Sequence, residues 1–145
     1  MAKEVDGVIL ESFHGNGTYS MKISGAVNHS NTYFIRKSLN EAGILPNQSI
    51  KYSDGIFLAF KKFFSEYFNM IKPLHLYFAG NIPERVVLDF RDSFFEDISG
   101  VALSLEALKH ARTKGFGLEL YVNENVHGKF KLAKLDSEFN FSEYR

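Results

Sequence analysis

Cysteine and tryptophan are absent from this 145-residue chain, and proline occurs only three times. Without cysteine, the sequence excludes a disulfide framework and a thiolate metal site. No eighteen apolar residues run together, so no membrane-spanning helix is predicted. An excess of charge is also lacking, because seventeen Lys and Arg balance seventeen Asp and Glu. Nucleic acid is therefore not an expected partner, since its binding rewards a clustered positive charge.

What the chain does contain is typical of one globular domain, predicted over residues 1–145. Hydrophobic residues make up 45% and charged residues 23%, and fifteen Phe and seven Tyr are present. The opening "MAKEVDGVIL" lacks the basic region and the long apolar run of a signal peptide. The expected location is therefore cytoplasmic.

The apolar periodicity predicts an α/β fold. A hairpin is indicated by Asn16-Gly17, a pair favoured where both turn residues have positive φ. The other boundaries come from Gly43, Pro73 and Gly115, which favour helix ends. The predicted strands are 7–13, 18–24, 84–90, 118–122 and 138–141, with a further short one within 74–81, and the predicted helices are 31–42, 56–72, 98–114 and 126–136.

The stretch "SFFEDISGVALSLE", residues 93–106, places Ser99 at the start of a helix beyond a buried strand. A catalytic nucleophile would favour G-x-S-x-G, but the first glycine is missing and the five histidines are scattered. A lone Gly100 is a weak signal for a phosphate-binding loop. Asp97 is a good N-cap, and Ser99 and Gly100 fit the first helical turn. Capping is the favoured interpretation, and a serine-dependent enzyme remains a distant alternative.

Taken together, "VVLDF", "FFED" and "ISG" resemble the STAS family, the domain shared by anti-sigma-factor antagonists and the cytoplasmic tails of SulP-type sulfate and anion permeases. The stretch "ISGAVNHSN", residues 23–31, resembles the family's second strand and following turn. The resemblance covers about residues 8–42 and 84–141. It implies a STAS-like mixed β-sheet packed with helices, with an extra inserted helix in an insertion over 44–83.

The family resemblance implies a non-catalytic regulatory and protein-interaction domain that uses no cofactor. The helix that begins at Asp97, Ile98, Ser99 and Gly100 would form the partner surface. The resemblance leaves weak nucleotide or anion binding open.

Two departures from the antagonist pattern bear on the branch of the family. Ile98 occupies the place of the phosphorylated hydroxyl residue, and the insertion 44–83 is longer than in the small antagonists. With Asn31, which permease tails often carry, these features favour the cytoplasmic domain of a SulP-type sulfate/anion transporter at the inner face of the membrane. The alternative is a free-standing antagonist-like partner-switch protein. The implied partner is accordingly a protein or the membrane part of a transporter.

The predicted helix 56–72 is unusually aromatic. Phe57, Phe60 and Phe64 share one face, whereas Phe63 points away from it. One interpretation is that the stripe covers the domain's own core. The other is that exposed rings support a homodimer or bind a partner, because a single core-facing stripe would leave Phe63 in water.

Overall fold

The computed structural model describes residues 2–46 and 83–143. The chain divides into two compact units, Met1–Leu45 with Pro83–Arg145, and Pro46–Ile82. The fold below is that of the first unit. The predicted aromatic helix with Phe57, Phe60, Phe63 and Phe64 lies outside the described residues, as does most of the predicted insertion.

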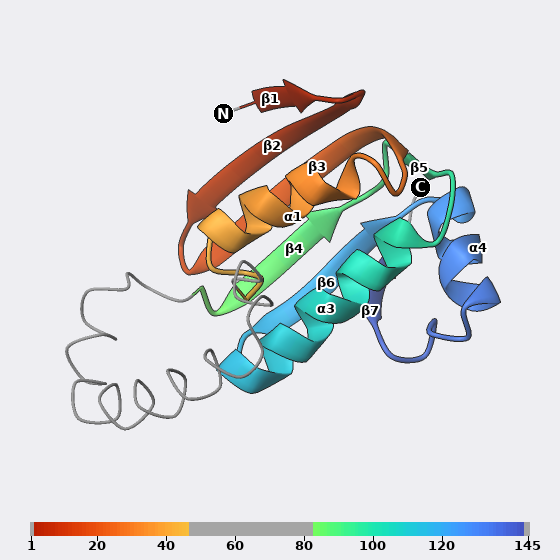
Figure 1. Ribbon diagram of the computed structural model, residues 1–145. Helices are drawn as coiled ribbons and strands as arrows, with labels where there is room; N and C mark the ends of the chain where they lie inside the picture. The colour runs from red at the N-terminus through yellow and green to blue at the C-terminus, as the bar shows by residue number, and fades with distance from the viewer. Residues whose placement is uncertain (1, 47–82, 144–145) are drawn as a thin grey trace, which may run out of the picture. The chain divides into compact units, whose positions relative to one another are not determined.

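One sheet of seven strands forms the framework (Figure 1). Its strand order is β1-β2-β3-β4-β6-β7, and β5 pairs with β3 beyond the end of β4. The pairs β1–β2 and β2–β3 are antiparallel, whereas β3–β4, β4–β6, β6–β7 and β3–β5 are parallel. The strands are β1 (Ala2–Val5), β2 (Val8–Gly15), β3 (Thr18–Val27), β4 (Arg85–Asp89), β5 (Ser93–Phe95), β6 (Gly117–Val122) and β7 (Asn140–Glu143).

The predicted hairpin is confirmed by the turn between β2 and β3. Gly15 pairs with Thr18, so Asn16 and Gly17 form the whole loop. Their φ angles are 52° and 75°, in the left-handed region that a two-residue hairpin turn of this type requires.

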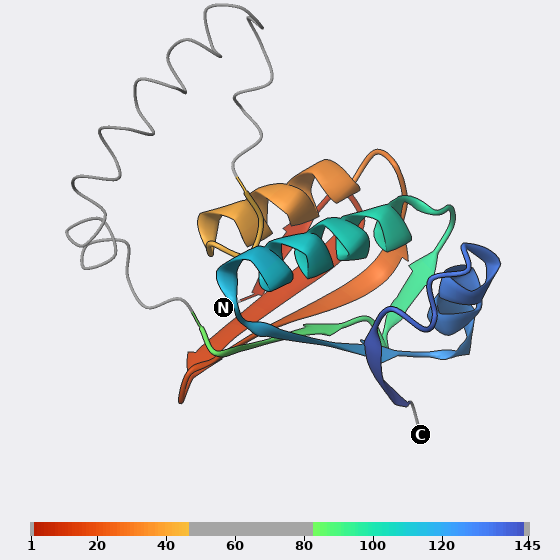
Figure 2. The same cartoon turned by 90° about the horizontal axis from the view of Figure 1, so that it is seen from below.

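The described part of the chain contains α1 (Thr32–Glu41), α3 (Ser99–Lys114) and α4 (Glu124–Leu132). Figure 2 shows α1 and α3 side by side on one face of the sheet, and α4 to the right of α3, beyond the end of β6. Between these helices and the sheet lies one apolar core, which includes Tyr19, Ile35, Leu88, Phe95, Leu103 and Leu120. Ile44 and Leu45, at the predicted start of the insertion, are buried in the same core.

The two helices on the sheet are joined by a bidentate ion pair. Arg36 of α1 donates to Glu106 of α3 through Nε at 3.1 Å and Nη2 at 2.9 Å. The helix α3 ends at its C-cap, Gly115, as the sequence predicted. The φ angle of Gly115 is 85°, in the left-handed region.

Two strands and one helix differ most from the sequence prediction. The strands β1 and β5 were not predicted, because each is short and depends on pairing with a distant strand. The helix α4 begins at Glu124 and ends at Leu132, not at 126 and 136. Lys134 has a φ of 58°, which a continuing helix excludes. Among the described helices, none combines the length and the apolar character needed to cross a membrane.

Candidate functional site

The candidate site is formed by two loops at the C-terminal ends of the parallel strands. The loop after β3 and the segment after β5 are hydrogen-bonded although they lie 68 positions apart in the sequence. Asn28 Nδ2 donates to Glu96 Oε2 at 3.0 Å, and the His29 amide donates to Asp97 Oδ2 at 3.0 Å. We call residues 28–31 and 94–100 together the α3-start surface.

Asp97 stabilises the first turn of α3 from one residue before the cap. The structure places the N-cap at Ile98, whose side chain has no capping oxygen, and not at Asp97 as predicted. The Asp97 carboxylate nevertheless accepts the Ser99 amide at 2.8 Å, in an Asx-turn geometry. Its hydrogen bond from the Ser99 hydroxyl, with those from the Ser99 and His29 amides, holds the pKa of Asp97 below its usual value.

Ile98 is the most exposed apolar side chain of this surface. It is 66% exposed, and Phe94 is 55% exposed, whereas Phe95 between them is fully buried. An aliphatic side chain this exposed buries little apolar area within its own domain. Such a residue is suited to burial against a partner.

Gly100 allows α3 to approach the core closely. A Cβ placed on Gly100 would lie 2.6 Å from the Phe95 ring, well inside van der Waals contact. Phe95 has little freedom to move, because it packs edge-to-face on Phe90 at 5.1 Å and against Phe130 at 6.3 Å. The first turn of α3 can therefore lie this close to Phe95 only because Gly100 has no side chain.

Asn31 is the buried polar centre of the loop after β3. Its side chain is fully buried and donates from Nδ2 to Ala26 O at 2.7 Å and to Asp6 O at 3.3 Å. Its Oδ1 accepts the Asn28 amide at 2.9 Å. One amide group thus holds the β1–β2 turn, the end of β3 and the loop in a fixed arrangement.

Two asparagines near α4 also hold the α3-start surface, and sequence reasoning missed both. Asn125 Oδ1 accepts the Phe95 amide at 2.9 Å. Asn123 Nδ2 donates to Ser93 O at 2.7 Å, and its Oδ1 caps α4 by accepting the Val126 amide at 2.9 Å. Asparagine followed by Glu124 is a helix-start signal that would have located this cap.

The arrangement around Ser99 differs from a Ser–His–Asp triad. The Ser99 hydroxyl donates to the Asp97 carboxylate directly, not to an imidazole. A carboxylate whose pKa is lowered is a weaker base, so it activates a hydroxyl poorly. Among residues 2–46 and 83–143, no group of His, Asp and Glu side chains is arranged to hold a metal ion.

Neither a protein-family model nor a curated protein sequence matches this chain. Solved structures do. The anti-sigma factor antagonist SpoIIAA in its unphosphorylated form matches with a TM-score of 0.59 and 15% identity, over 94% of this chain and 88% of that chain. An anti-sigma factor antagonist from Mycobacterium paratuberculosis matches with a TM-score of 0.58 and 11% identity, over 94% and 86%. The chain therefore has the mixed α/β fold of these antagonists, the STAS fold, and the predicted fold class is confirmed.

The two polar residues at the helix start should differ in their effect on stability. We expect Asp97→Ala to lower the free energy of unfolding by about 0.5–2 kcal/mol, because the Ser99 and His29 amides lose the carboxylate that accepts their hydrogen bonds. Ser99→Ala should cost less, because the Ser99 amide still reaches the carboxylate. Urea unfolding of both variants makes the comparison, and a larger loss for Ser99→Ala would contradict this assignment.

The contribution of Asp97 should also depend on pH. A carboxylate with a lowered pKa stabilises the fold above its unfolded pKa, and this stabilisation is lost as pH falls through the folded pKa. The difference between wild type and Asp97→Ala should therefore be full at neutral pH and shrink in acid.

Proposed function

We propose that this chain is a non-catalytic STAS-type regulatory domain that binds a protein partner through the α3-start surface. The observation that carries the proposal is Ile98, which is 66% exposed at the end of a helix fixed by hydrogen bonds from two loops. A rigid apolar contact loses little conformational entropy on binding. The fold shared with two anti-sigma factor antagonists supports a regulatory role.

Two contexts for such a domain are supported by different observations. Ile98 in place of a hydroxyl residue and the long segment 46–82 favour the cytoplasmic domain of a SulP-type sulfate/anion transporter, at the inner face of the membrane. The two similar structures, both of anti-sigma factor antagonists, favour a free-standing partner-switch protein.

Photo-crosslinking from position 98 tests the proposal. A photoreactive phenylalanine replaces Ile98 in cells that produce the protein natively, and the same residue at Leu132 serves as the control. Leu132 is 77% exposed on α4, outside the α3-start surface. We expect a discrete protein adduct from position 98 only.

The identity of that adduct separates the contexts. A membrane transport protein supports the first, and an anti-sigma or kinase-like regulator supports the second. The absence of a discrete adduct at position 98, or the same adducts from position 132, would contradict the proposed function.

Phosphorylation should not regulate this surface at its helix start. Ile98 has no oxygen to accept a phosphoryl group, and the Ser99 hydroxyl is already bonded to Asp97, whose negative charge would oppose a phosphate. After incubation with cognate regulatory kinases and ATP, mass spectrometry should find no stoichiometric modification at Ser99. Clean modification there would restore the phosphorylation-driven switch.

A further inference from the structure

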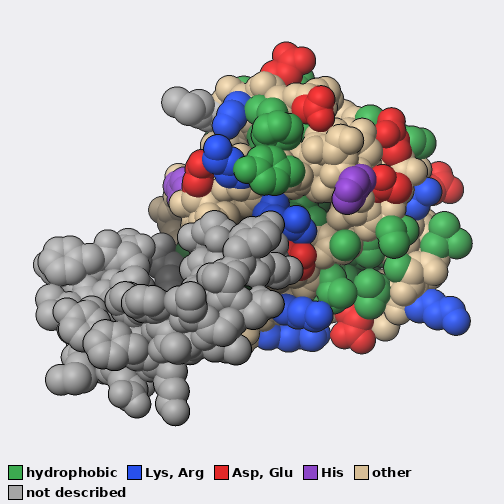
Figure 3. Space-filling view, in the orientation of Figure 1, with side chains coloured by type: hydrophobic (Ala, Val, Ile, Leu, Met, Phe, Trp, Pro, Cys, Tyr) green, Lys and Arg blue, Asp and Glu red, His purple; other side chains and the backbone are tan. Residues whose placement is uncertain are grey.

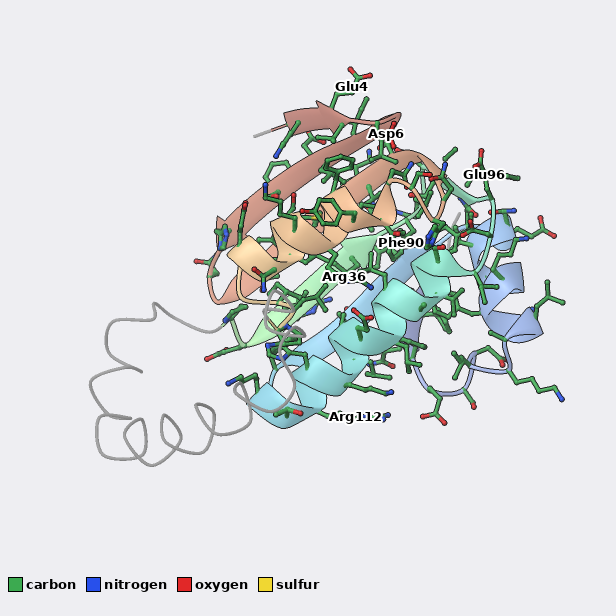
Figure 4. The ribbon with its side chains drawn as sticks, viewed as in Figure 1. Glu4, Asp6, Arg36, Phe90, Glu96 and Arg112 are labelled. Atoms are coloured by element: carbon green, nitrogen blue, oxygen red, sulfur yellow. The ribbon has the colours of Figure 1, made fainter. Side chains whose placement is uncertain are left out.

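The α3-start surface is rimmed by four acidic side chains from three separate segments. Glu96 and Asp97 belong to the segment after β5, and Asp97 is partly exposed while Glu96 is exposed. Asp6 is exposed in the β1–β2 turn, whose carbonyl is bound by Asn31 of the loop after β3. Glu124 is exposed between the two asparagines that hold residues 93–95. Figure 4 shows Asp6 and Glu96 at the same end of the sheet, with Arg112 at the opposite end of α3.

The ion pairs of the described residues do not involve these carboxylates. Five ion pairs are formed, and none includes Asp6, Glu96, Asp97 or Glu124. Arg91, on the turn between β4 and β5, is bonded to Asp89 and lies over the Tyr121 ring at 4.9 Å. In Figure 3 several acidic side chains are seen over the upper and right parts of the view, with Lys and Arg side chains among them.

Helix capping accounts for only part of this acidity. Asp97 and Glu124 lie at the starts of α3 and α4, where a carboxylate complements the helix dipole. Asp6 lies in a turn between two strands, and the Glu96 side chain bonds to a side-chain amide, so neither serves a helix end. Neither a helix end nor an ion pair of the described residues therefore accounts for Asp6 and Glu96.

We infer that the partner of the α3-start surface presents basic side chains around an apolar contact that receives Ile98. The exposed apolar residues supply the buried centre and the carboxylates supply a complementary rim. A partner with an acidic contact face would meet four like charges. The inference rests on the proposed function and specifies the chemistry of its partner.

Three synthetic peptides of equal length test the charge preference, with repeats Lys-Leu-Ser, Gln-Leu-Ser and Glu-Leu-Ser. Each is titrated into the ¹⁵N-labelled full chain, and amide shifts are followed by NMR. We expect the Lys peptide to shift the amides of residues 28–31 and 94–100, and the Glu peptide to leave them unchanged. The affinity of the Lys peptide should fall about tenfold between low and high salt, because salt screens the attraction between exposed charges.

Matched variants assign the effect to the acidic rim. Asp6→Asn combined with Glu96→Gln should weaken the Lys peptide by about threefold to tenfold, since each exposed charge pair contributes modestly. The control Glu138→Gln removes an exposed carboxylate near Arg112 and should leave the affinity unchanged. Both sets leave Asp97 intact, so the helix start is preserved.

The outcomes separate this inference from the proposed function. Equal shifts of these amides by the Gln peptide would overturn the basic-partner inference and leave an interaction surface in place. Lys-peptide shifts centred elsewhere, or no binding, would overturn it as well. Crosslinking from position 98 judges the proposed function independently of all three peptides.

Discussion

Replacing Gly100 with alanine should lower the free energy of unfolding by about 1–3 kcal/mol, the usual cost of overpacking a core. The expectation reverses the ordinary rule, since Gly→Ala inside a helix normally stabilises by about 0.5–1 kcal/mol. Here the new methyl group would lie 2.6 Å from the Phe95 ring. The ring is held by Phe90 and Phe130, so α3 must move away from the sheet.

Gly128 provides the matched control, because it is the other glycine inside a described helix. A Cβ placed there has no heavy atom within 4 Å. Gly128→Ala should therefore stabilise the protein by about 0.5–1 kcal/mol. Urea unfolding followed by circular dichroism compares the two. Opposite signs are expected, and a stabilised Gly100→Ala would show that the Phe95 contact is not needed.

A second substitution tests whether the contact with Phe95 causes the destabilisation of Gly100→Ala. Phe95→Leu alone should destabilise by leaving a cavity. In the Gly100→Ala background its cost should be smaller, because the shorter side chain makes room for the methyl group. The double-mutant cycle measures this coupling directly.

Asn31→Asp should cost about 2–4 kcal/mol, because each buried group left without its hydrogen-bond partner costs about 1–3 kcal/mol. The substitution keeps the size of the side chain but removes both hydrogen-bond donors. Ala26 O and Asp6 O would then face a carboxylate oxygen in a fully buried position. The β1–β2 turn should loosen together with the loop after β3.

Thermal and urea unfolding at several pH values test this prediction. The penalty should shrink in acid, where a protonated carboxyl can donate one of the lost bonds. The control Asn140→Asp makes the same chemical change at an exposed position on β7 and should stay within about 0.5 kcal/mol of wild type. If Asn31→Asp also stayed within about 0.5 kcal/mol of wild type, the hydrogen bonds of Asn31 would contribute little to stability.

The sequence predicted the elements whose signals are local. Asn16-Gly17 fixed the hairpin, an apolar run gave the central strand β4, and Gly115 gave the end of α3. The strand β5 was missed because Ser93–Phe95 has no strand pattern of its own and is held by pairing with β3.

The site was predicted only in part for the same reason. Asp97, Ser99 and Gly100 could be assigned to a helix start, but the reason for Gly100 is Phe95, which the sequence pattern did not connect to it. Asn28 and Asn31 hold their partners through contacts across the fold, up to 68 positions away. Such long-range amide contacts leave no periodic signal.

The points where segment 46–82 joins the sheet have a consequence for how such a domain can be altered. Glu84 and Arg85 donate their amides to Gly17 O at 2.8 and 3.2 Å, at the opposite end of β3 from Asn28. Before the segment, α1 runs from the Asn31 cap to Ala42, and Ile44 is bonded to Leu39 O at 2.8 Å. Both junctions are thus fixed remotely from Ile98. A change confined to either junction should therefore leave the hydrogen bonds of the α3-start surface in place.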